Sequence, residues 1–209
     1  MSRQVRPGAE PAEEPSSRDP LAARVIALGE ALESAGIPFA FGDAVALACY
    51  TGSAPAGEID LLIFVPASAP EGALEALGRL HPPFAAAAVA GDTRDSGQAR
   101  VRWDAVRVNL FFQDLPFLES AARRTKRVPF SGTHIEVLSA EDLVVCKAMF
   151  NRRKDWDEIE QLLYHRGYGF NYAYARSWLF EMVGTNDLRV RELDLLATQV
   201  EHWMRSRRR

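Results

Sequence analysis

The segment 37–64, IPFAFGDAVALACYTGSAPAGEIDLLIF, constrains the fold of this chain more than any other segment. It is typical of a short apolar strand, a glycine turn, a helix of small residues, a loop and a second strand that begins with two acids. Side chains alternate along a strand, so Glu58, Asp60 and Leu62 are expected to share one face. Two carboxylates on one face of a buried strand repel each other unless a cation or hydrogen bonds offset their charge. The pattern therefore predicts either a divalent-metal site or a sheet edge that emerges into water here.

The composition is that of an ordinary globular protein. Hydrophobic residues make up 47% of the 209 residues and charged residues 25%, so the chain can bury a sizeable core. No apolar run approaches the ~20 residues of a membrane-spanning helix, and the amino-terminal segment lacks the apolar core of a secretory signal. We therefore expect a cytoplasmic protein without a membrane partner, in which Cys49 and Cys146 are buried free thiols. The net charge of −3 argues against a general nucleic-acid coat.

Three regions are expected along the chain. Residues 1–19 are rich in Pro, Glu, Ser and Arg and are predicted to be disordered, because they offer little apolar surface to offset the entropy of ordering. Residues 20–138 alternate helical and extended patterns, which predict an α+β core with a mixed sheet of four or five strands. Residues 139–209 carry helical patterns, so a carboxy-terminal helical bundle packed on the core is expected.

Local signals predict further elements, and one segment is ambiguous. The alanine-rich segment 84–90 is compatible with either a strand or a helix. The clearer signals predict a β-hairpin over 98–103 and 106–112, a helix capped by Ser139, and amphipathic helices over 172–183 and 187–204.

Two segments carry a resemblance to a known family. The segment 37–64, together with VLSAEDLVVCKAMFNRRKDWDEIEQLL over 137–163, resembles the nucleotidyltransferases of the polymerase-beta type, and among them the AbiEii-like and MNT-like proteins. In those proteins a capped helix that carries a lysine is followed by Arg-x-Lys-Asp and a further helix. The hairpin RVRWDAVRVNLFF over 100–112 is similar to the region between the two motifs. The resemblance implies a nucleotidyltransferase-type fold over about 37–163.

The resemblance also implies an activity. Such proteins transfer a nucleoside monophosphate from a nucleoside triphosphate to a hydroxyl or amine, and the acceptor could be a tRNA, a protein or a small molecule. Mg²⁺ or Mn²⁺ held by paired carboxylates neutralises the triphosphate and stabilises the leaving pyrophosphate. The matching residues are Glu58 and Asp60 for the metal pair, Gly42 for phosphate binding, Asn109 for the position of a third acid, and Lys147, Lys154 and Asp155 for the helical signature.

Several positions depart from the family pattern. Asp43 occupies the place of a second glycine, and as a helix N-cap its carboxylate would bond the amides that a phosphate needs. Asn109 cannot supply the charge of a third acid, and Glu58 is longer than the aspartate expected there. An arginine and a threonine expected before the metal pair are missing from SAPAG. A second hypothesis is therefore a catalytically inactive binding module that acts through a bound nucleotide or a protein partner, for example in a toxin–antitoxin system.

The residues of the helical signature have alternatives of their own. Lys147 is expected to be either a nucleotide ligand or an ordinary residue of a helix surface. Lys154 and Asp155, with Asp157 and Glu158 after them, are also compatible with a solvated helix start whose acids suit the helix dipole.

Overall fold

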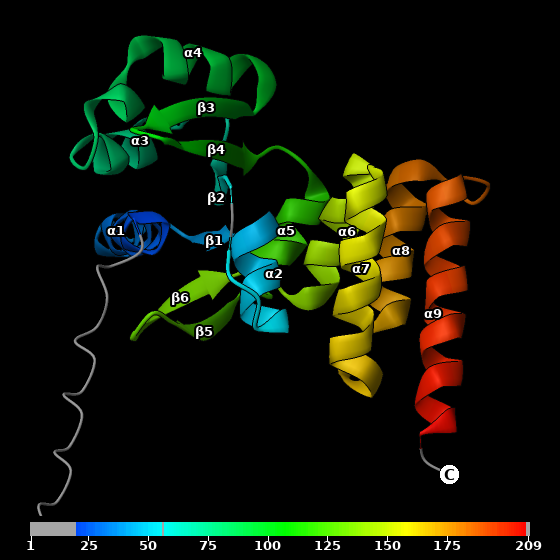
Figure 1. Cartoon of the computed structure of the whole chain (residues 1–209). Coiled ribbons are helices and arrows are strands. Elements are labelled where there is room, and N and C mark those ends of the chain that lie inside the picture. Colours follow the sequence, from blue (N-terminus) through cyan, green and yellow to red (C-terminus); the bar gives the residue numbers. More distant parts are fainter. Residues whose placement is uncertain (1–19, 56, 208–209) are drawn as a thin grey trace, which may run out of the picture.

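A computed structural model of the chain describes residues 20–55 and 57–207. Its centre is a six-stranded mixed sheet with the strand order β3-β4-β2-β1-β6-β5 (Figure 1). The pairs β2–β4 and β1–β6 are parallel, and the other neighbouring strands are antiparallel. The strands are β1 (Phe39–Phe41), β2 (Ile59–Pro66), β3 (Gln98–Trp103), β4 (Val106–Gln113), β5 (Lys126–Phe130) and β6 (Thr133–Val137).

Strand β2 is the centre of the core. Its residues from Ile59 to Phe64 are all buried, because β1 and β4 flank the strand and helices cover both faces of the sheet. The predicted central strand, the predicted hairpin and the α+β class are confirmed. The sheet has six strands instead of four or five, because Phe41 of β1 pairs with Val137 of β6 and thereby adds the hairpin β5–β6.

The helices divide between the two faces of the sheet. In Figure 1, α1 and α3 lie on one side, α2 and the carboxy-terminal helices lie on the other, and α4 lies over β3 at the edge of the sheet. The ambiguous segment 84–90 belongs to a 3-10 turn and to α4, so its helical interpretation is correct. The helical elements are α1 (Pro20–Ser34), α2 (Asp43–Thr51), α3 (Glu71–Gly78), η1 (Pro82–Ala85), α4 (Ala87–Ser96), α5 (Pro116–Ala122), α6 (Ala140–Phe150), α7 (Arg153–Arg166), η2 (Gly167–Gly169), α8 (Tyr172–Val183) and α9 (Leu188–Ser206).

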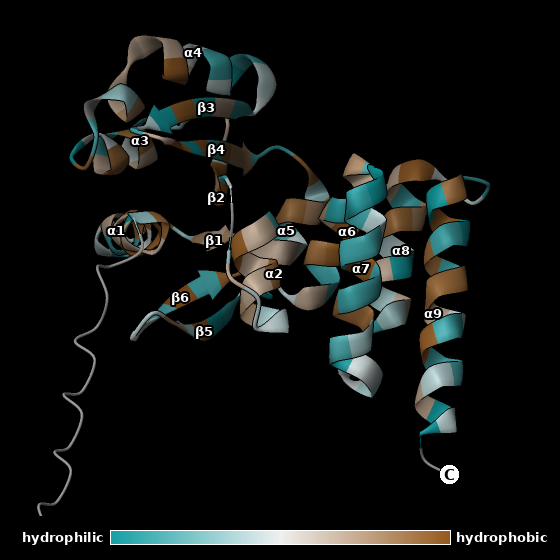
Figure 2. Cartoon of the chain, in the orientation of Figure 1, coloured by the Kyte–Doolittle hydropathy of each residue, from teal (hydrophilic) through white to brown (hydrophobic). Residues whose placement is uncertain are grey.

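The carboxy-terminal helices pack on one another and on α2. Figure 2 shows hydrophobic and hydrophilic residues alternating around α9, as the predicted amphipathic pattern requires; Val190, Leu193, Leu196 and Val200 are its buried residues. Within the described ranges, no helix combines the length and the apolar character that crossing a membrane requires. The division into three regions stays a prediction, and the tail 1–19 lies outside the described residues.

The end of α3 packs closely on the turn that follows it. A β-carbon on Gly78 would lie 2.6 Å from Cβ of Ala85, whereas a β-carbon on Gly91 of α4 would meet open space. We expect Gly78→Ala to lower the free energy of unfolding by ~1–3 kcal/mol through this overlap. Gly91→Ala should raise it by ~0.5–1 kcal/mol, because alanine is the better helix former. Urea denaturation of both variants measures the difference, and equal effects would contradict the packing argument.

Candidate active site

The three residues predicted at the metal site meet on one face of the sheet. Asp60 in β2 is the register partner of Asn109 in the parallel strand β4. The Asn109 amide nitrogen Nδ2 donates hydrogen bonds of 2.7 Å to Asp60 Oδ1 and 2.8 Å to Glu58 Oε2. Arg107, also in β4, forms an ion pair with Glu58. The two carboxylates therefore converge, and an amide and a guanidinium offset part of their charge.

Asp60 lies in an environment that disfavours its charge. The residue is only 9% exposed, so the alternative of a sheet edge that emerges into water does not describe it. Burial raises the pKa of Asp60 above its usual range, and the hydrogen bond from Asn109 offsets only part of that effect. The nearby carboxylates of Asp43 and Glu58 raise the pKa of Asp60 further. A cation beside Asp60 would relieve both the burial and the repulsion.

The donor atoms at this cluster suit a hard divalent ion. Asn109 Oδ1 is buried and has no hydrogen-bond partner among the described residues. A half-turn of the amide would bring Oδ1 beside the two carboxylates, which is favourable only with a cation between them. Two carboxylates and an amide oxygen are ligands of the kind that Mg²⁺ and Mn²⁺ take. The residues therefore fit such an ion, with two negative charges in place of three.

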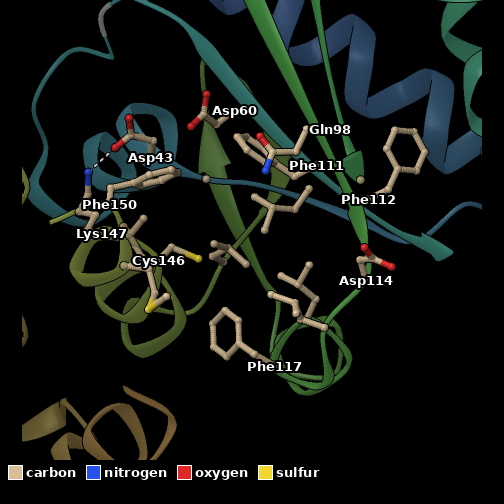
Figure 3. A pocket seen from close by; sticks show the side chains of 18 of the residues that line it. Asp43, Asp60, Gln98, Phe111, Phe112, Asp114, Phe117, Cys146, Lys147 and Phe150 are labelled. Carbon is tan, nitrogen blue, oxygen red and sulfur yellow. Dashed lines mark hydrogen bonds and ion pairs between the residues drawn. The ribbon is translucent and has the colours of Figure 1, made fainter. Parts of the chain in front are cut away.

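A cavity of about 390 Å³ opens beside the cluster (Figure 3). Its polar lining includes Gly42, Asp43, Asp60 and Lys147. Apolar side chains make most of the remaining wall, including Phe111, Phe117, Leu143, Met149, Phe150 and Met182. Of the three residues of the carboxylate cluster, Asp60 lines this cavity, whereas Asn109 lines a neighbouring hollow beside β3.

The prediction that Asp43 caps α2 is wrong. Gly42 is the N-cap residue, and the structure shows no side-chain capping bond there among the described residues. Asp43 is the first residue of the helix and has a positive φ of 32°, a conformation that glycine adopts more readily than aspartate. Its carboxylate accepts a hydrogen bond from Lys147 Nζ instead. Asp43 therefore does not block the amides at the start of α2, although its negative charge lines the same cavity.

Gly42 has a packing role that is independent of any ligand. A β-carbon at this position would lie 2.8 Å from Cδ1 of Leu62, so Leu62 would have to move to accept a side chain. The Gly42 amide also donates a 2.9 Å hydrogen bond to the carbonyl oxygen of Asp60. The glycine therefore joins the start of α2 directly to the strand that carries the acids.

Lys147 is a buried residue, so its interpretation as an ordinary helix-surface residue is wrong. Its side chain is 1% exposed, and Nζ forms ion pairs with Asp43 and, at 2.6 Å, with Glu158 of α7. Burial alone would lower the pKa of Lys147, but the two carboxylates outweigh burial and raise it. Oxygen atoms of Asp43, Asp155 and Glu158 lie within 4.8 Å of one another, and Lys147 supplies a cation at this second acidic cluster.

Lys154 and Asp155 differ in their surroundings. Asp155 is fully buried and accepts hydrogen bonds from the backbone amide of Arg152 at 2.9 Å and from its Nε at 2.7 Å. These bonds outweigh burial and hold the pKa of Asp155 below its usual range. Lys154 is exposed and forms no ion pair within the described part of the chain. Lys154 therefore fits the alternative of a solvated helix start. Asp155 does not fit it, because its hydrogen bonds fix the beginning of α7.

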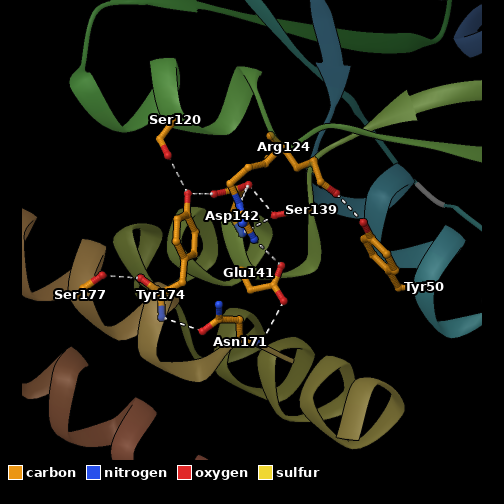
Figure 4. A network of polar contacts seen from close by, with 10 residues as sticks. Tyr50, Ser120, Arg124, Ser139, Glu141, Asp142, Asn171, Tyr174 and Ser177 are labelled. Carbon is orange, nitrogen blue, oxygen red and sulfur yellow. Dashed lines mark hydrogen bonds and ion pairs between the residues drawn. The ribbon is translucent and has the colours of Figure 1, made fainter. Parts of the chain in front are cut away.

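A buried polar network holds α6 in place (Figure 4). Ser139 caps α6 as predicted, and its hydroxyl also bonds the carboxylate of the fully buried Asp142. Tyr174 of α8 donates a 2.7 Å hydrogen bond to Asp142. Arg124 forms a 3.0 Å ion pair with Glu141 and lies 3.9 Å from the centre of the Tyr174 ring. The network ties α6 to α8 and to the segment before β5, and so positions the helix that carries Lys147.

The comparisons with known proteins place no family on this chain. No protein-family model matches it, and no curated protein matches it. Among solved structures it is similar to an antigenic nucleotidyltransferase-like protein from Paracoccidioides brasiliensis, with a TM-score of 0.47 and 15% identity. The similarity covers 84% of this chain and 94% of that chain. These values are too low for the similarity to support a family or a function.

Proposed function

We propose that this chain is a nucleotidyltransferase-type protein of the AbiEii-like and MNT-like kind, which binds a nucleoside triphosphate with Mg²⁺ or Mn²⁺ beside Asp60. The convergence of Glu58 and Asn109 on Asp60, which lines the same cavity as Gly42, carries this proposal. The sequence resemblance over 37–163 supports it. The product of the reaction would be a nucleoside monophosphate attached to a hydroxyl or amine of a tRNA, a protein or a small molecule.

Each residue has a distinct part in this proposal. A divalent cation would neutralise the triphosphate and stabilise the leaving pyrophosphate, and Glu58, Asp60 and the oxygen of Asn109 would hold it. The backbone amides that follow Gly42 at the start of α2 would face a phosphate oxygen. Lys147 would keep the Asp43 carboxylate away from those amides through the ion pair between them. The apolar wall of the cavity would contact the base and exclude water.

The second candidate function is a binding module without transfer activity. Two observations favour it: the Asn109 amide already lies between the two carboxylates, and Asp43 adds a negative charge where phosphates would approach. Such a module would act through a bound nucleotide or a protein partner, and a toxin–antitoxin pair is one setting for it. Cytoplasmic residence remains part of both proposals.

Titration calorimetry of ATP, GTP, CTP and UTP tests the proposed site. With Mn²⁺ present, we expect Asp60→Asn to weaken binding of the preferred nucleotide by about thirtyfold, because the buried carboxylate is the main ligand of the ion. Asp104→Asn is the matched control, since Asp104 lies in the exposed turn between β3 and β4, and it should bind like the wild type. EDTA should abolish binding. No binding of any of the four nucleotides by the wild type would refute the proposal.

A transfer assay separates the two candidate functions. The protein is incubated with Mn²⁺ and nucleotides labelled at the α-phosphate, together with total tRNA, with cell protein or with a small-molecule extract of cells. Label that enters an acceptor, and that Asp60→Asn eliminates, would establish the enzyme. Metal-dependent binding without label in any acceptor would establish the binding module.

A further inference from the structure

A row of three polar side chains crosses the sheet from the carboxylate cluster to its edge. Asp60 of β2, Asn109 of β4 and Arg100 of β3 are register partners in neighbouring strands. Register partners point to the same side of a sheet, and the neighbours of Arg100 in β3 are buried on the opposite side. With neighbouring strands ~4.8 Å apart, the Cα atoms of Asp60 and Arg100 are about 10 Å apart. Arg100 therefore shares the face of the carboxylate cluster at a distance that a phosphate chain can bridge.

A second row runs parallel to the first. Arg107 of β4 pairs in register with Arg102 of β3, and its guanidinium forms the ion pair with Glu58. This row also begins at an acid of the cluster and ends at an arginine of β3. The face is therefore acidic at β2 and cationic at β3, in two adjacent rows.

The two arginines of β3 are exposed, and their guanidinium groups are available to bind an anion. Neither Arg100 nor Arg102 forms a salt bridge with any side chain in the described ranges, whereas Arg107 is engaged by Glu58. Arg100 lines a hollow at the edge of the sheet, together with Asp92 and Asp95 of α4. Those aspartates reduce the local positive potential, but neither forms an ion pair with Arg100 that would hold its guanidinium.

The hollow beside Arg100 adjoins the large cavity. Ser96, Gln98 and Phe111 line both, so the two hollows are neighbours at the β3 side of the cavity. Figure 3 shows Gln98 and Phe111 beside Asp60 at this boundary.

The charges at the other end of the cavity favour additional cations at β3 for binding a triphosphate. Asp43 and Asp60 are acidic, and Lys147 is already paired with Asp43 and Glu158. A triphosphate and these acids together carry more negative charge than one metal ion at Asp60 would neutralise. Arginine is well suited to neutralise the remaining negative charge, because its guanidinium can donate two hydrogen bonds to phosphate oxygens at once.

We propose that Arg100 and Arg102 bind the phosphates of the nucleoside triphosphate whose metal ion is held at Asp60 and Glu58. This inference rests on the proposed function and assigns phosphate contacts to β3 in addition to the start of α2. A purely structural reading is that charged residues protect β3, an edge strand, from pairing with other chains. That role would affect aggregation but not the affinity for phosphates.

Titration calorimetry with inorganic tripolyphosphate and with each of the four nucleoside triphosphates, all with Mn²⁺, tests the inference. The variants are Arg100→Gln, Arg102→Gln and the double variant, with Arg79→Gln, at the exposed C-cap of α3 and paired with Glu75, as the matched control. We expect each single variant to lose about tenfold in affinity for tripolyphosphate and nucleotide, and the double variant about a hundredfold. Arg79→Gln should bind like the wild type, and all the variants should keep the melting temperature of the wild type.

The outcomes separate this inference from the function on which it rests. If Asp60→Asn weakens nucleotide binding while the double arginine variant binds as tightly as Arg79→Gln, the arginine assignment is refuted and the proposed function holds. If the wild type binds neither tripolyphosphate nor any nucleotide, both are refuted. A loss of affinity in the β3 variants that Arg79→Gln does not share, at an unchanged melting temperature, supports the assignment.

Discussion

Replacing Lys147 with methionine is expected to lower the free energy of unfolding by about 3–5 kcal/mol, because two carboxylates would lose the buried cation that compensates them. The Lys147 side chain is 1% exposed and pairs with Asp43 and Glu158, which come from two other helices. Methionine has a similar length and no charge, so the variant removes the ion pairs without opening a large cavity.

Urea denaturation followed by circular dichroism measures this loss. Lys154→Met is the matched control, because Lys154 is exposed at the start of α7 and its replacement should change stability by less than ~0.5 kcal/mol. A triple variant, Lys147→Met with Asp43→Asn and Glu158→Gln, should recover most of the loss by removing the uncompensated charges. Equal stability of Lys147→Met and Lys154→Met would show that the ion pairs contribute nothing.

The pH dependence of the same comparison follows from the pKa of Lys147. That pKa is raised in the folded protein, so the stabilisation by the ion pairs is fully present below the ordinary value of 10.5 and is lost as the pH rises through the folded value. The difference between the wild type and Lys147→Met should therefore persist at neutral pH and shrink only in strongly alkaline solution.

Local patterns were sufficient to predict much of the fold and part of the site. The alternation along β2 placed Glu58 and Asp60 on one face, and both side chains accept hydrogen bonds from Asn109. The serine followed by acids at the start of α6 predicted a cap that the structure contains. These features depend on neighbours in sequence or on the period of a strand, so they can be read without knowing the tertiary structure.

Contacts between distant residues account for the predictions that failed. Asp43 has the local character of an N-cap, but Lys147, which lies 104 positions away, binds its carboxylate instead. The burial of Lys147 could not be read from its helix, because both of its partners lie on other elements. The arginines of β3 share the face of Asp60 only in the observed register, and a slip by one residue would turn them to the opposite face.

Replacing Asn109 with aspartate is expected to raise the affinity for Mn²⁺ by about a hundredfold, because it adds a third carboxylate to the two that converge there. Without metal, the same variant loses both hydrogen bonds of the amide and adds a like charge, so its free energy of unfolding should fall by ~2–4 kcal/mol. Saturating Mn²⁺ should recover ~3 kcal/mol of this loss when the free ion is at about a hundred times its dissociation constant. Lower stability without metal and higher affinity for Mn²⁺ are together characteristic of a metal site. They are not expected for a replacement at a purely structural asparagine.

Thermal unfolding with and without Mn²⁺, together with calorimetric titration of the ion, distinguishes a working metal site from a retired one. Asn171→Asp is the control, since Asn171 is the exposed N-cap of α8 and aspartate can cap a helix equally well. Metal binding by the wild type that Asn109→Asp strengthens would mean that the amide is a weak ligand in a functioning site. Binding that appears only in Asn109→Asp would mean that the amide has replaced the ion, in favour of the binding module. An unchanged response to Mn²⁺ in Asn109→Asp would exclude a metal ion between these strands, because the third carboxylate would then complete no coordination shell.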